Sequence, residues 1–372
     1  MASASIRLKR AMEQIAADGL SGLLALSNGH NSFLETNPVY VLSGFRAIGE
    51  SAVVVSRSGA TLIVTPEWDA KRARDHSCIG DVVSTGDLAS AVADAMRKHG
   101  LDPGRSRAIG LNTARRELLA QIGRLAGSLP AASDDFAREL AKIRTSEELD
   151  HARKATWIAE RGYERLLKSA RPGLREFELA ADIYCEMKGL GAEDNFLLMS
   201  ASQHNLAVRA AGQRVLEEGD IILAEITPCY RGQFVQICRT AVIGEPRPIV
   251  MDKFAILQQA MSAGQKAAAA GTTVAEITAA MNRHIAAAGY GDYCRPPYMR
   301  VRGHGLGITS SLPGDIDSAN HLALEEGMVF VMHPNQYIPE SGYLLCGETV
   351  VVRPDGAHSL SAKNAELDVI PV

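Results

Sequence analysis

EEGDIILAEITPCYRGQFVQICRTAVI, residues 217–243, contains the pattern that decides the fold of the second half of this chain. Two apolar runs in it, Ile221–Ile226 and Phe234–Ile243, predict strands. Apolar runs and helical periodicity beyond them predict further strands at 328–332 and 348–352 and helices at 176–188 and 251–289. We therefore expect an α+β domain with a curved antiparallel sheet.

The first 140 residues have a different pattern, in which short strand-like runs alternate with amphipathic helical segments. This alternation predicts an α/β domain. The predicted strands are Gly22–Leu26, Tyr40–Leu42, Ala52–Val55 and Thr61–Thr65, and the predicted helices are Ile6–Asp18, Asp87–His99 and Ala114–Leu129.

The segment AKIRTSEELDHARKA, residues 141–155, predicts the start of a long helix at the domain boundary. Ser146 is the expected N-cap, because acidic residues follow it in the first turn and basic residues come later, which suits the helix dipole. We therefore divide the chain into an N-terminal domain, residues 1–140, and a catalytic domain, residues 141–372.

The composition is that of a folded globular protein with a small-molecule or peptide partner. Of 372 residues, 46% are hydrophobic and 22% are charged, and the formal net charge is −4. Because acidic and basic residues are interspersed, we expect no nucleic-acid partner and no attraction to an anionic membrane. No stretch reaches the length of about 18 apolar residues that a membrane-spanning helix needs.

The six cysteines are scattered without a CxxC pair, which favours reduced thiols over a disulfide framework or a zinc knuckle. The amphipathic N-terminus, MASASIRLKRAMEQIAADG, lacks the uninterrupted apolar run of a signal peptide. We therefore expect a cytoplasmic protein.

Six segments occur in the order and spacing of the pita-bread enzymes, the creatinase/aminopeptidase P family, which the chain resembles over nearly its whole length. That resemblance implies a creatinase-like N-terminal domain and a pita-bread catalytic domain. The segments are KIRTSEELDHARKA (142–155), RPGLREFELA (171–180), EEGDIILAEI (217–226), GHGLG (303–307), LEEGMVFVMHP (324–334) and GETVVV (347–352).

In metal-dependent members of this family, two aspartates, one histidine and two glutamates hold a pair of divalent ions. The corresponding positions here are Glu225, Gln236, His304, His333 and Gly347, so one of five ligands is unchanged. Replacement of carboxylates by a neutral amide and by glycine removes negative charge that two cations require. The resemblance therefore predicts no dinuclear centre and no metal cofactor.

Creatinase and ectoine hydrolase are the family members that this pattern of ligand loss resembles. The segment AEITPCYRGQFVQICRT, residues 224–240, is especially similar to the ectoine hydrolase version. The resemblance implies a hydrolase that cleaves a non-peptide C–N bond in a small zwitterionic amidine, guanidino or cyclic amide compound.

Three side chains are the expected catalytic groups. Glu225 lies among apolar residues in a strand, where burial raises a carboxyl pKa toward the range of a general base. His304, between two glycines, and His333, at a former ligand position, are expected to carry the proton to the departing nitrogen. Gln236 and Glu348 are candidate substrate-binding residues, with Glu348 expected to face the cationic part of the substrate.

Three arginines are candidate substrate-binding residues as well. Arg209 and Arg302 are possible partners of a substrate carboxylate. Arg46 occupies the position from which creatinase-like enzymes reach into the site of a partner subunit, so the resemblance also implies a homodimer.

Two alternatives remain open from the sequence. Glu225, His304 and His333 also match a 2-His-1-carboxylate site for one divalent ion, zinc or iron, which suits an Xaa-Pro-type peptidase or a lyase. The fold is also known in relatives without catalysis, so the chain is alternatively a pita-bread binding module.

Overall fold

The computed structural model describes residues 2–310 and 312–372. The chain divides into two compact units, Met1–Lys142 and Ile143–Val372, each with its own sheets and core. The first unit is α/β and the second is α+β, which is the predicted fold class. Among the described residues, no helix is both long and apolar enough to cross a membrane.

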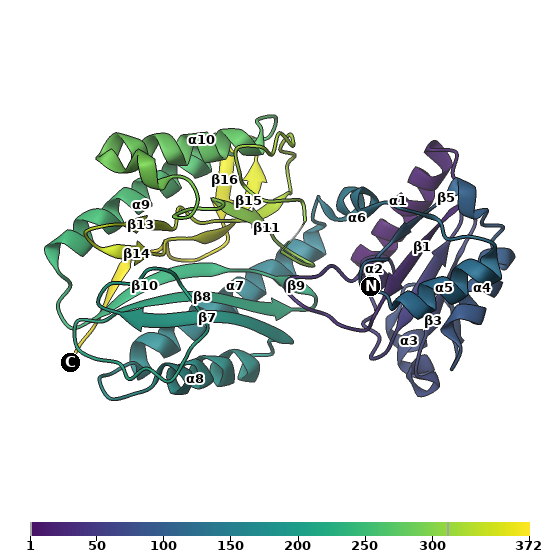
Figure 1. The fold of residues 1–372 in the computed structure, drawn as a ribbon, viewed down its shortest axis with the longest axis horizontal. Helices are drawn as coiled ribbons and strands as arrows, with labels where there is room; N and C mark the ends of the chain where they lie inside the picture. The colour runs from purple at the N-terminus through teal and green to yellow at the C-terminus, as the bar shows by residue number, and fades with distance from the viewer. Residues whose placement is uncertain (1, 311) are drawn as a thin grey trace. The chain divides into compact units, whose positions relative to one another are not determined.

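The first unit contains one six-stranded sheet in the order β4-β3-β2-β1-β5-β6, of which Figure 1 labels β1, β3 and β5. Its centre is antiparallel, because β1 pairs with β2 and β2 with β3 in that sense, whereas the remaining pairs are parallel. The strands are β1 (Gly22–Ser27), β2 (Ser51–Val55), β3 (Ala60–Val64), β4 (Asp81–Ser84), β5 (Ser106–Ile109) and β6 (Ala131–Ala132).

Helices cover this sheet and bury its apolar side chains. One core cluster joins Leu24, Val54 and Ile63 of the strands to Val92 and Ile122 of helices α4 and α5. The helices of this unit are α1 (Ala2–Ala17), α2 (Pro38–Ser43), α3 (Ala70–His76), α4 (Leu88–Lys98), α5 (Arg116–Ala126) and α6 (Asp134–Ala141).

The predicted strand at Tyr40–Leu42 is wrong, because these residues lie in helix α2. Asn37 caps the helix by accepting a hydrogen bond from the Tyr40 backbone, and Pro38 occupies the first turn, where its missing N–H costs nothing. The short run of β-branched and aromatic residues favours a strand, but the local capping of α2 outweighs this propensity.

In the second unit, the first sheet has the order β17-β10-β8-β7, and the short strand β9 pairs with β8. Helices α7 (Ser146–Ser169) and α8 (Glu176–Gly189) pack on one face of it (Figure 1). The strands are β7 (Asp194–Ser202), β8 (Ile221–Tyr230), β9 (Gln233–Phe234), β10 (Ile237–Ile243) and β17 (Leu367–Ile370).

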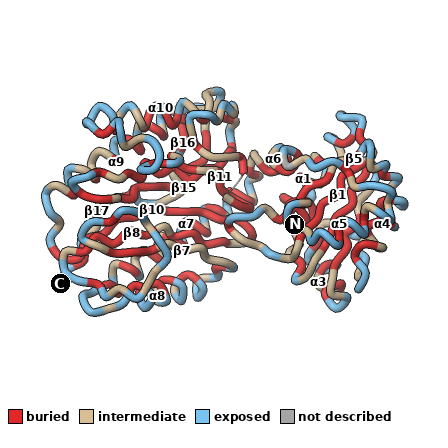
Figure 2. The backbone as a smooth tube through the Cα atoms, viewed as in Figure 1, coloured by how far each residue is buried: buried red, intermediate tan, exposed pale blue. Residues whose placement is uncertain are grey.

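A second sheet of this unit has the order β11-β12-β15-β16, and helix α9 packs against it. Its strands are buried along most of their length (Figure 2). The remaining elements are β11 (Gly303–Gly305), β12 (Val329–Met332), β15 (Glu348–Arg353), β16 (Gly356–Ser359), the hairpin β13 (Gln336–Ile338) and β14 (Gly342–Leu344), and helices α9 (Pro248–Ala267) and α10 (Val274–Ile285).

Three predicted boundaries of the second unit shift in the structure. Thr145, rather than Ser146, caps helix α7 through a reciprocal capping box with Glu148. The predicted strand 234–243 is interrupted at Gln236, and the predicted helix 251–289 divides into α9 and α10.

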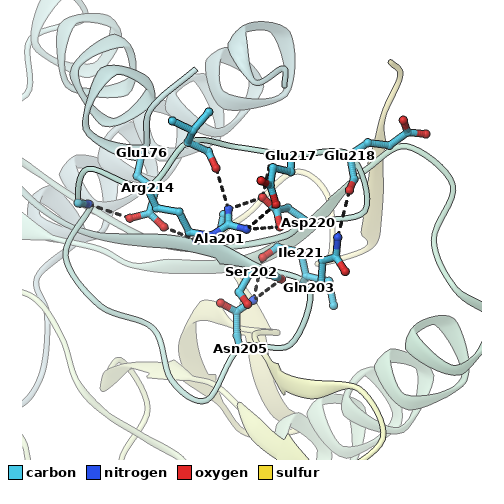
Figure 3. Close-up of polar contacts among 12 residues, drawn as sticks. Glu176, Ala201, Ser202, Gln203, Asn205, Arg214, Glu217, Glu218, Asp220 and Ile221 are labelled. Carbon is cyan, nitrogen blue, oxygen red and sulfur yellow. Dashed lines mark hydrogen bonds and ion pairs between the residues drawn. The ribbon is translucent and has the colours of Figure 1, made fainter. Parts of the chain in front are cut away.

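A buried polar network fixes the segments at one end of β7 and β8 (Figure 3). Asp220, which is fully buried, pairs with Arg214 and accepts a hydrogen bond from the Glu217 backbone. Glu176 of helix α8, also fully buried, accepts the Ala201 backbone N–H of β7 at 2.8 Å. These contacts satisfy the charges and hold the sheet that carries the candidate site.

Candidate active site

Glu225 lies on the face of the first sheet that is opposite to helices α7 and α8. Its neighbours Ala224 and Ile226 point into the helix-side core, and strand side chains alternate between faces. Leu198 of β7 and Cys238 of β10 are its cross-strand partners, so the three side chains form one row. Glu225 is partly exposed, whereas eight of the ten β8 residues are buried.

The environment of Glu225 holds its carboxyl group near the midpoint of titration at neutral pH. Burial raises the pKa of Glu225 to about 7, and a hydrogen bond from the Gln236 side chain opposes this shift. The side-chain amide of Asn335 also donates to Glu225 Oε1 at 3.2 Å. The predicted upward shift of the Glu225 pKa is therefore present in the structure.

His304 lies on the second sheet, in strand β11, with Val331 of β12 as its cross-strand partner. Thr349 of β15 is also paired with Val331, so His304 and Thr349 share a face. The Thr349 hydroxyl donates to the Gln236 carbonyl and accepts from the Gln236 N–H, both at 2.8 Å. These hydrogen bonds join this face of the second sheet to Gln236, which directly precedes β10 of the first sheet.

His304 and His333 contact each other edge to face, with ring centroids 5.7 Å apart. His304 Nδ1 lies 3.0 Å from the Gly305 carbonyl, which places the proton of the neutral ring on Nδ1. Burial lowers the pKa of His304, and burial and His304 together lower the pKa of His333 to about 3. His333 is therefore neutral near pH 7, and of the two forms considered from the sequence this favours the neutral ring.

Several buried polar atoms of this region have no hydrogen-bond partner among the described residues. They are His333 Nδ1, Gln236 Oε1, Thr227 Oγ1 and Ser200 Oγ. Thr227 follows Glu225 by two positions on the same face of β8, and Ser200 lies two positions from Leu198 on β7. Because buried polar atoms are nearly always paired, each of these atoms is a candidate partner for a water or a polar ligand.

Glu348 does not face the site. Its carboxylate pairs with the buried Arg239 at 3.0 Å and accepts a hydrogen bond from the Ser361 hydroxyl. Arg239 extends toward Tyr163 of helix α7, on the side of the sheet away from Glu225. The expectation that Glu348 binds the cationic part of a substrate is therefore not met.

Arg302 is a structural residue rather than a partner of a substrate carboxylate. It is completely buried, and its guanidinium donates to Asn282 Oδ1 at 2.7 Å and to the Asn335 carbonyl at 3.0 Å. A third hydrogen bond, of 2.8 Å, reaches Gln336 Oε1. Arg302 thus holds the segment that carries Asn335, the hydrogen-bond donor to Glu225.

The other two arginines have partners of their own. Arg209 is an exposed residue whose guanidinium lies 3.6 Å from the buried carboxylate of Glu176. Arg46 belongs to the first unit, where its guanidinium lies 5.0 Å from the centroid of the Tyr40 ring. Within the second unit, the candidate site therefore contains Glu225, His304, His333 and Gln236, without Arg209 and Arg302.

Two residues of the site were missed in the sequence, Asn335 and Tyr343. Asn335 accepts the Cys346 N–H at 2.9 Å and donates to Glu225, so it ties both ends of the β13–β14 hairpin to the site. Tyr343 lies on the hairpin, and burial, with a contribution from Glu225, raises its pKa well above the usual range. The only sequence signal for either residue was the position of Asn335 directly after His333 and Pro334.

The fold and the sequence place the protein among known enzymes. Residues 150–354, more than half of the chain, match the description Metallopeptidase family M24, and the chain belongs to this family. It is 28% identical to the Xaa-Pro dipeptidase of Pyrococcus furiosus over 333 residues, which cover 88% of this chain and 92% of that protein.

Solved structures agree with this assignment and share the pita-bread fold. The prolidase from Pyrococcus horikoshii OT3 superposes with a TM-score of 0.84 and 23% identity, covering 97% of this chain and 99% of that one. Dipeptidase PepE from Mycobacterium ulcerans gives a TM-score of 0.82 and 27% identity, covering 100% and 99%.

These relatives correct two expectations. The interpretation as a non-peptide C–N hydrolase similar to creatinase or ectoine hydrolase is contradicted, because the similar proteins are named as prolidases and dipeptidases. The expectation of no metal cofactor is contradicted as well, because the family is one of metallopeptidases.

The side chains do not, however, fit a two-ion centre. Gln236 offers a neutral amide, and Gly347 offers no side chain. A β-carbon at Gly347 would lie 2.7 Å from His333 Cβ and 3.0 Å from Cys238 Sγ, so the space for a ligand there is filled. Within residues 2–310 and 312–372, no group of three or more His, Cys, Asp or Glu side chains is arranged to hold an ion.

Proposed function

We propose that this chain is a hydrolase of small peptides of the Xaa-Pro dipeptidase type, with its site between the two sheets of the second unit. Membership in a peptidase family and the similarity to an Xaa-Pro dipeptidase over 88% of the chain support this class of substrate. One structural observation carries the proposal: Glu225 is partly exposed and has a pKa of about 7 beside unpaired buried polar atoms.

A carboxyl group with this pKa suits proton transfer at neutral pH. Glu225 takes a proton from the attacking water and returns it to the nitrogen that leaves when the peptide C–N bond breaks. Asn335 holds Glu225 Oε1, and Gln236 contacts the same carboxylate, so the group has a fixed orientation. His304, with its proton on Nδ1, presents Nε2 as a hydrogen-bond acceptor.

A second candidate function, a peptide-binding module without turnover, is favoured by the packing at Gly347. His333 and Cys238 fill the space beside this glycine, and Gln236 offers a neutral amide in place of a carboxylate. A site with these side chains retains partners for a polar ligand but lacks the charge that the family's ion pair requires.

Proline release from Ala-Pro and Met-Pro, with Ala-Ala as a comparison peptide, distinguishes the two functions. The assay is run on the metal-depleted protein and after addition of Mn²⁺, Co²⁺ or Zn²⁺, and calorimetry measures dipeptide binding in parallel. Hydrolysis of Xaa-Pro peptides that is lost in Glu225→Gln supports the peptidase. Binding without proline release supports the module, and absence of both binding and release refutes both functions.

Elemental analysis of the same preparations counts the ions. From Gln236 and the filled space at Gly347, we expect fewer than two metal ions per chain at saturation. Two ions bound at full occupancy, with both lost in a His304→Ala variant, would show that the side chains rearrange into the family's centre.

We also propose that the chain forms a homodimer, since symmetric pairs are the commonest assemblies of folded proteins. Light scattering at micromolar concentration tests this proposal, and a monomer throughout would remove Arg46 from any shared site.

A further inference from the structure

The hairpin β13–β14 begins one residue after Asn335 and presents aromatic side chains on one face. In each strand, the two outer residues are buried and the central tyrosine is partly exposed. Tyr337 and Tyr343 are those central residues, and they are direct cross-strand partners. Adjacent side chains of such a pair lie on the same face, so the hairpin has one buried face and one tyrosine face.

The hairpin is fixed to both halves of the site. At its base, Asn335 donates to Glu225 and accepts from the Cys346 backbone. On its other strand, the Tyr343 N–H donates to the Asn205 carbonyl at 2.6 Å. Asn205 is itself held by hydrogen bonds to the Ser202 and Ile221 carbonyls, at the end of β7 and the start of β8 (Figure 3).

Other aromatic rings continue the tyrosine face to the protein surface. Tyr298 stacks on Tyr337 with centroids 5.6 Å apart and an interplanar angle of 16°. Tyr293 lies 4.8 Å from Tyr298, and His204 meets Tyr337 edge to face at 6.0 Å. Tyr298 remains 42% exposed, so an aromatic surface runs outward from the hairpin that follows Asn335.

The charged groups beside these rings have partners of their own. Glu340 accepts a hydrogen bond from the Tyr290 hydroxyl at 3.0 Å, and Asp292 pairs with Arg295 at 3.0 Å. The surface therefore offers ring faces and edges rather than a single uncompensated charge. Such a surface suits an aromatic side chain, which gains from stacked and edge-to-face contacts beyond its burial.

We propose that Tyr298 and Tyr337, with Tyr293 and His204 beside them, form a subsite for an aromatic side chain at the variable position of the peptide substrate. This inference rests on the proposed peptidase function. Its physical basis is the continuity between Glu225, Asn335 and the tyrosine face of the hairpin. Tyr343 occupies the inner end of that face.

The test compares Phe-Pro with Gly-Pro, because glycine has no side chain to enter the subsite. In Tyr298→Ala, the ratio of kcat/KM for Phe-Pro to kcat/KM for Gly-Pro should fall about three- to tenfold, the range expected for loss of one aromatic pair. Tyr298→Phe retains the ring and should restore the ratio. Tyr184→Ala is the matched control, since Tyr184 is 38% exposed on helix α8.

Calorimetry of Phe-Pro binding keeps the subsite testable if the protein has no peptidase activity. Weaker binding of Phe-Pro to Tyr298→Ala than to wild type, with Tyr184→Ala unchanged, supports the subsite even when no proline is released. Equal Phe-Pro affinities in wild type and Tyr298→Ala would overturn it. Proline release with an unchanged substrate ratio would overturn the subsite and leave the peptidase function standing.

Discussion

The side-chain amide of Asn335 donates a 3.2 Å hydrogen bond to the carboxylate of Glu225. The same asparagine is held by Arg302, whose guanidinium donates to the Asn335 carbonyl. Asn335, in the segment between β12 and β13, therefore orients the candidate base Glu225, and the buried Arg302 holds Asn335 in place.

Glu225→Gln should reduce turnover of a confirmed peptide substrate by about 10²- to 10⁴-fold, because it removes the proton acceptor but keeps size and a hydrogen-bond acceptor for Asn335. Circular dichroism should show an unchanged fold. Glu217→Gln, at a side chain that is 66% exposed, is the matched control and should retain activity. A rate near that of wild type in Glu225→Gln would exclude Glu225 as the base.

Glu225 should also leave a signature in the pH dependence of stability. Its ordinary pKa is near 4.5 and its folded pKa is about 7, so between these values the folded state binds more protons than the unfolded state. The free energy of unfolding therefore falls as pH rises through this window, by about 3 kcal/mol for a shift of this size. Urea unfolding across pH 4.5–7.5 should show this fall in wild type, relative to Glu225→Gln.

A carboxylate that is stabilised as an anion by the site would give the opposite result. In that case, the difference between wild type and Glu225→Gln would stay constant or rise with pH. Such a result would show that the Glu225 pKa is not raised in the folded protein.

The strands that form the site were predictable because their apolar runs are long and their order matches a known family. β8 and β12 begin at or next to the residues expected from the sequence, and Glu225, Gln236, His304 and His333 all lie near the two-sheet junction. Glu225 and His304 lie in strands, whereas Gln236 precedes β10 and His333 follows β12; all four positions were identified through the resemblance to the family.

The partners of Arg209, Arg302 and Glu348 were not predictable, because they are distant in the sequence. Glu348 pairs with Arg239, 109 residues earlier, and Arg302 bonds Asn282 and the segment that contains Asn335 and Gln336. The sequence does not show which residue a charged side chain contacts. A member of a buried ion pair therefore cannot be distinguished from a substrate-binding residue. Only tertiary packing separates them.

Arg302→Met should reduce stability strongly and should not act through substrate affinity alone. The change leaves the Asn282 oxygen, the Asn335 carbonyl and the Gln336 oxygen unpaired in the core, and each such group costs about 1–3 kcal/mol. Chemical unfolding measures the loss. Arg209→Met, at a side chain that is 55% exposed, should change the free energy of unfolding by less than about 1 kcal/mol.

A different outcome for Arg302→Met would restore the interpretation made from the sequence. If its unfolding curve matched that of wild type while KM for the peptide rose, Arg302 would be a substrate contact rather than a structural residue.

Gly347→Ala tests the packing that separates this site from a two-ion centre. The new methyl group would lie 2.7 Å from His333 Cβ and 3.0 Å from Cys238 Cβ and Sγ. Strand backbones on both sides fix these atoms, since Gly347 and Cys238 exchange backbone hydrogen bonds of 3.0 and 3.1 Å. Overpacking of this kind should lower the free energy of unfolding by about 1–3 kcal/mol.

Gly189→Ala is the matched control, because a β-carbon there meets no atom within 4 Å and the position is helical. It should leave stability unchanged or raise it by up to about 1 kcal/mol. Gly347→Glu should lose at least as much stability as Gly347→Ala and should not increase the number of bound metal ions measured by elemental analysis. An ion gained in Gly347→Glu, with stability retained, would show that His333 and Cys238 move aside and that a carboxylate at position 347 can bind a metal ion.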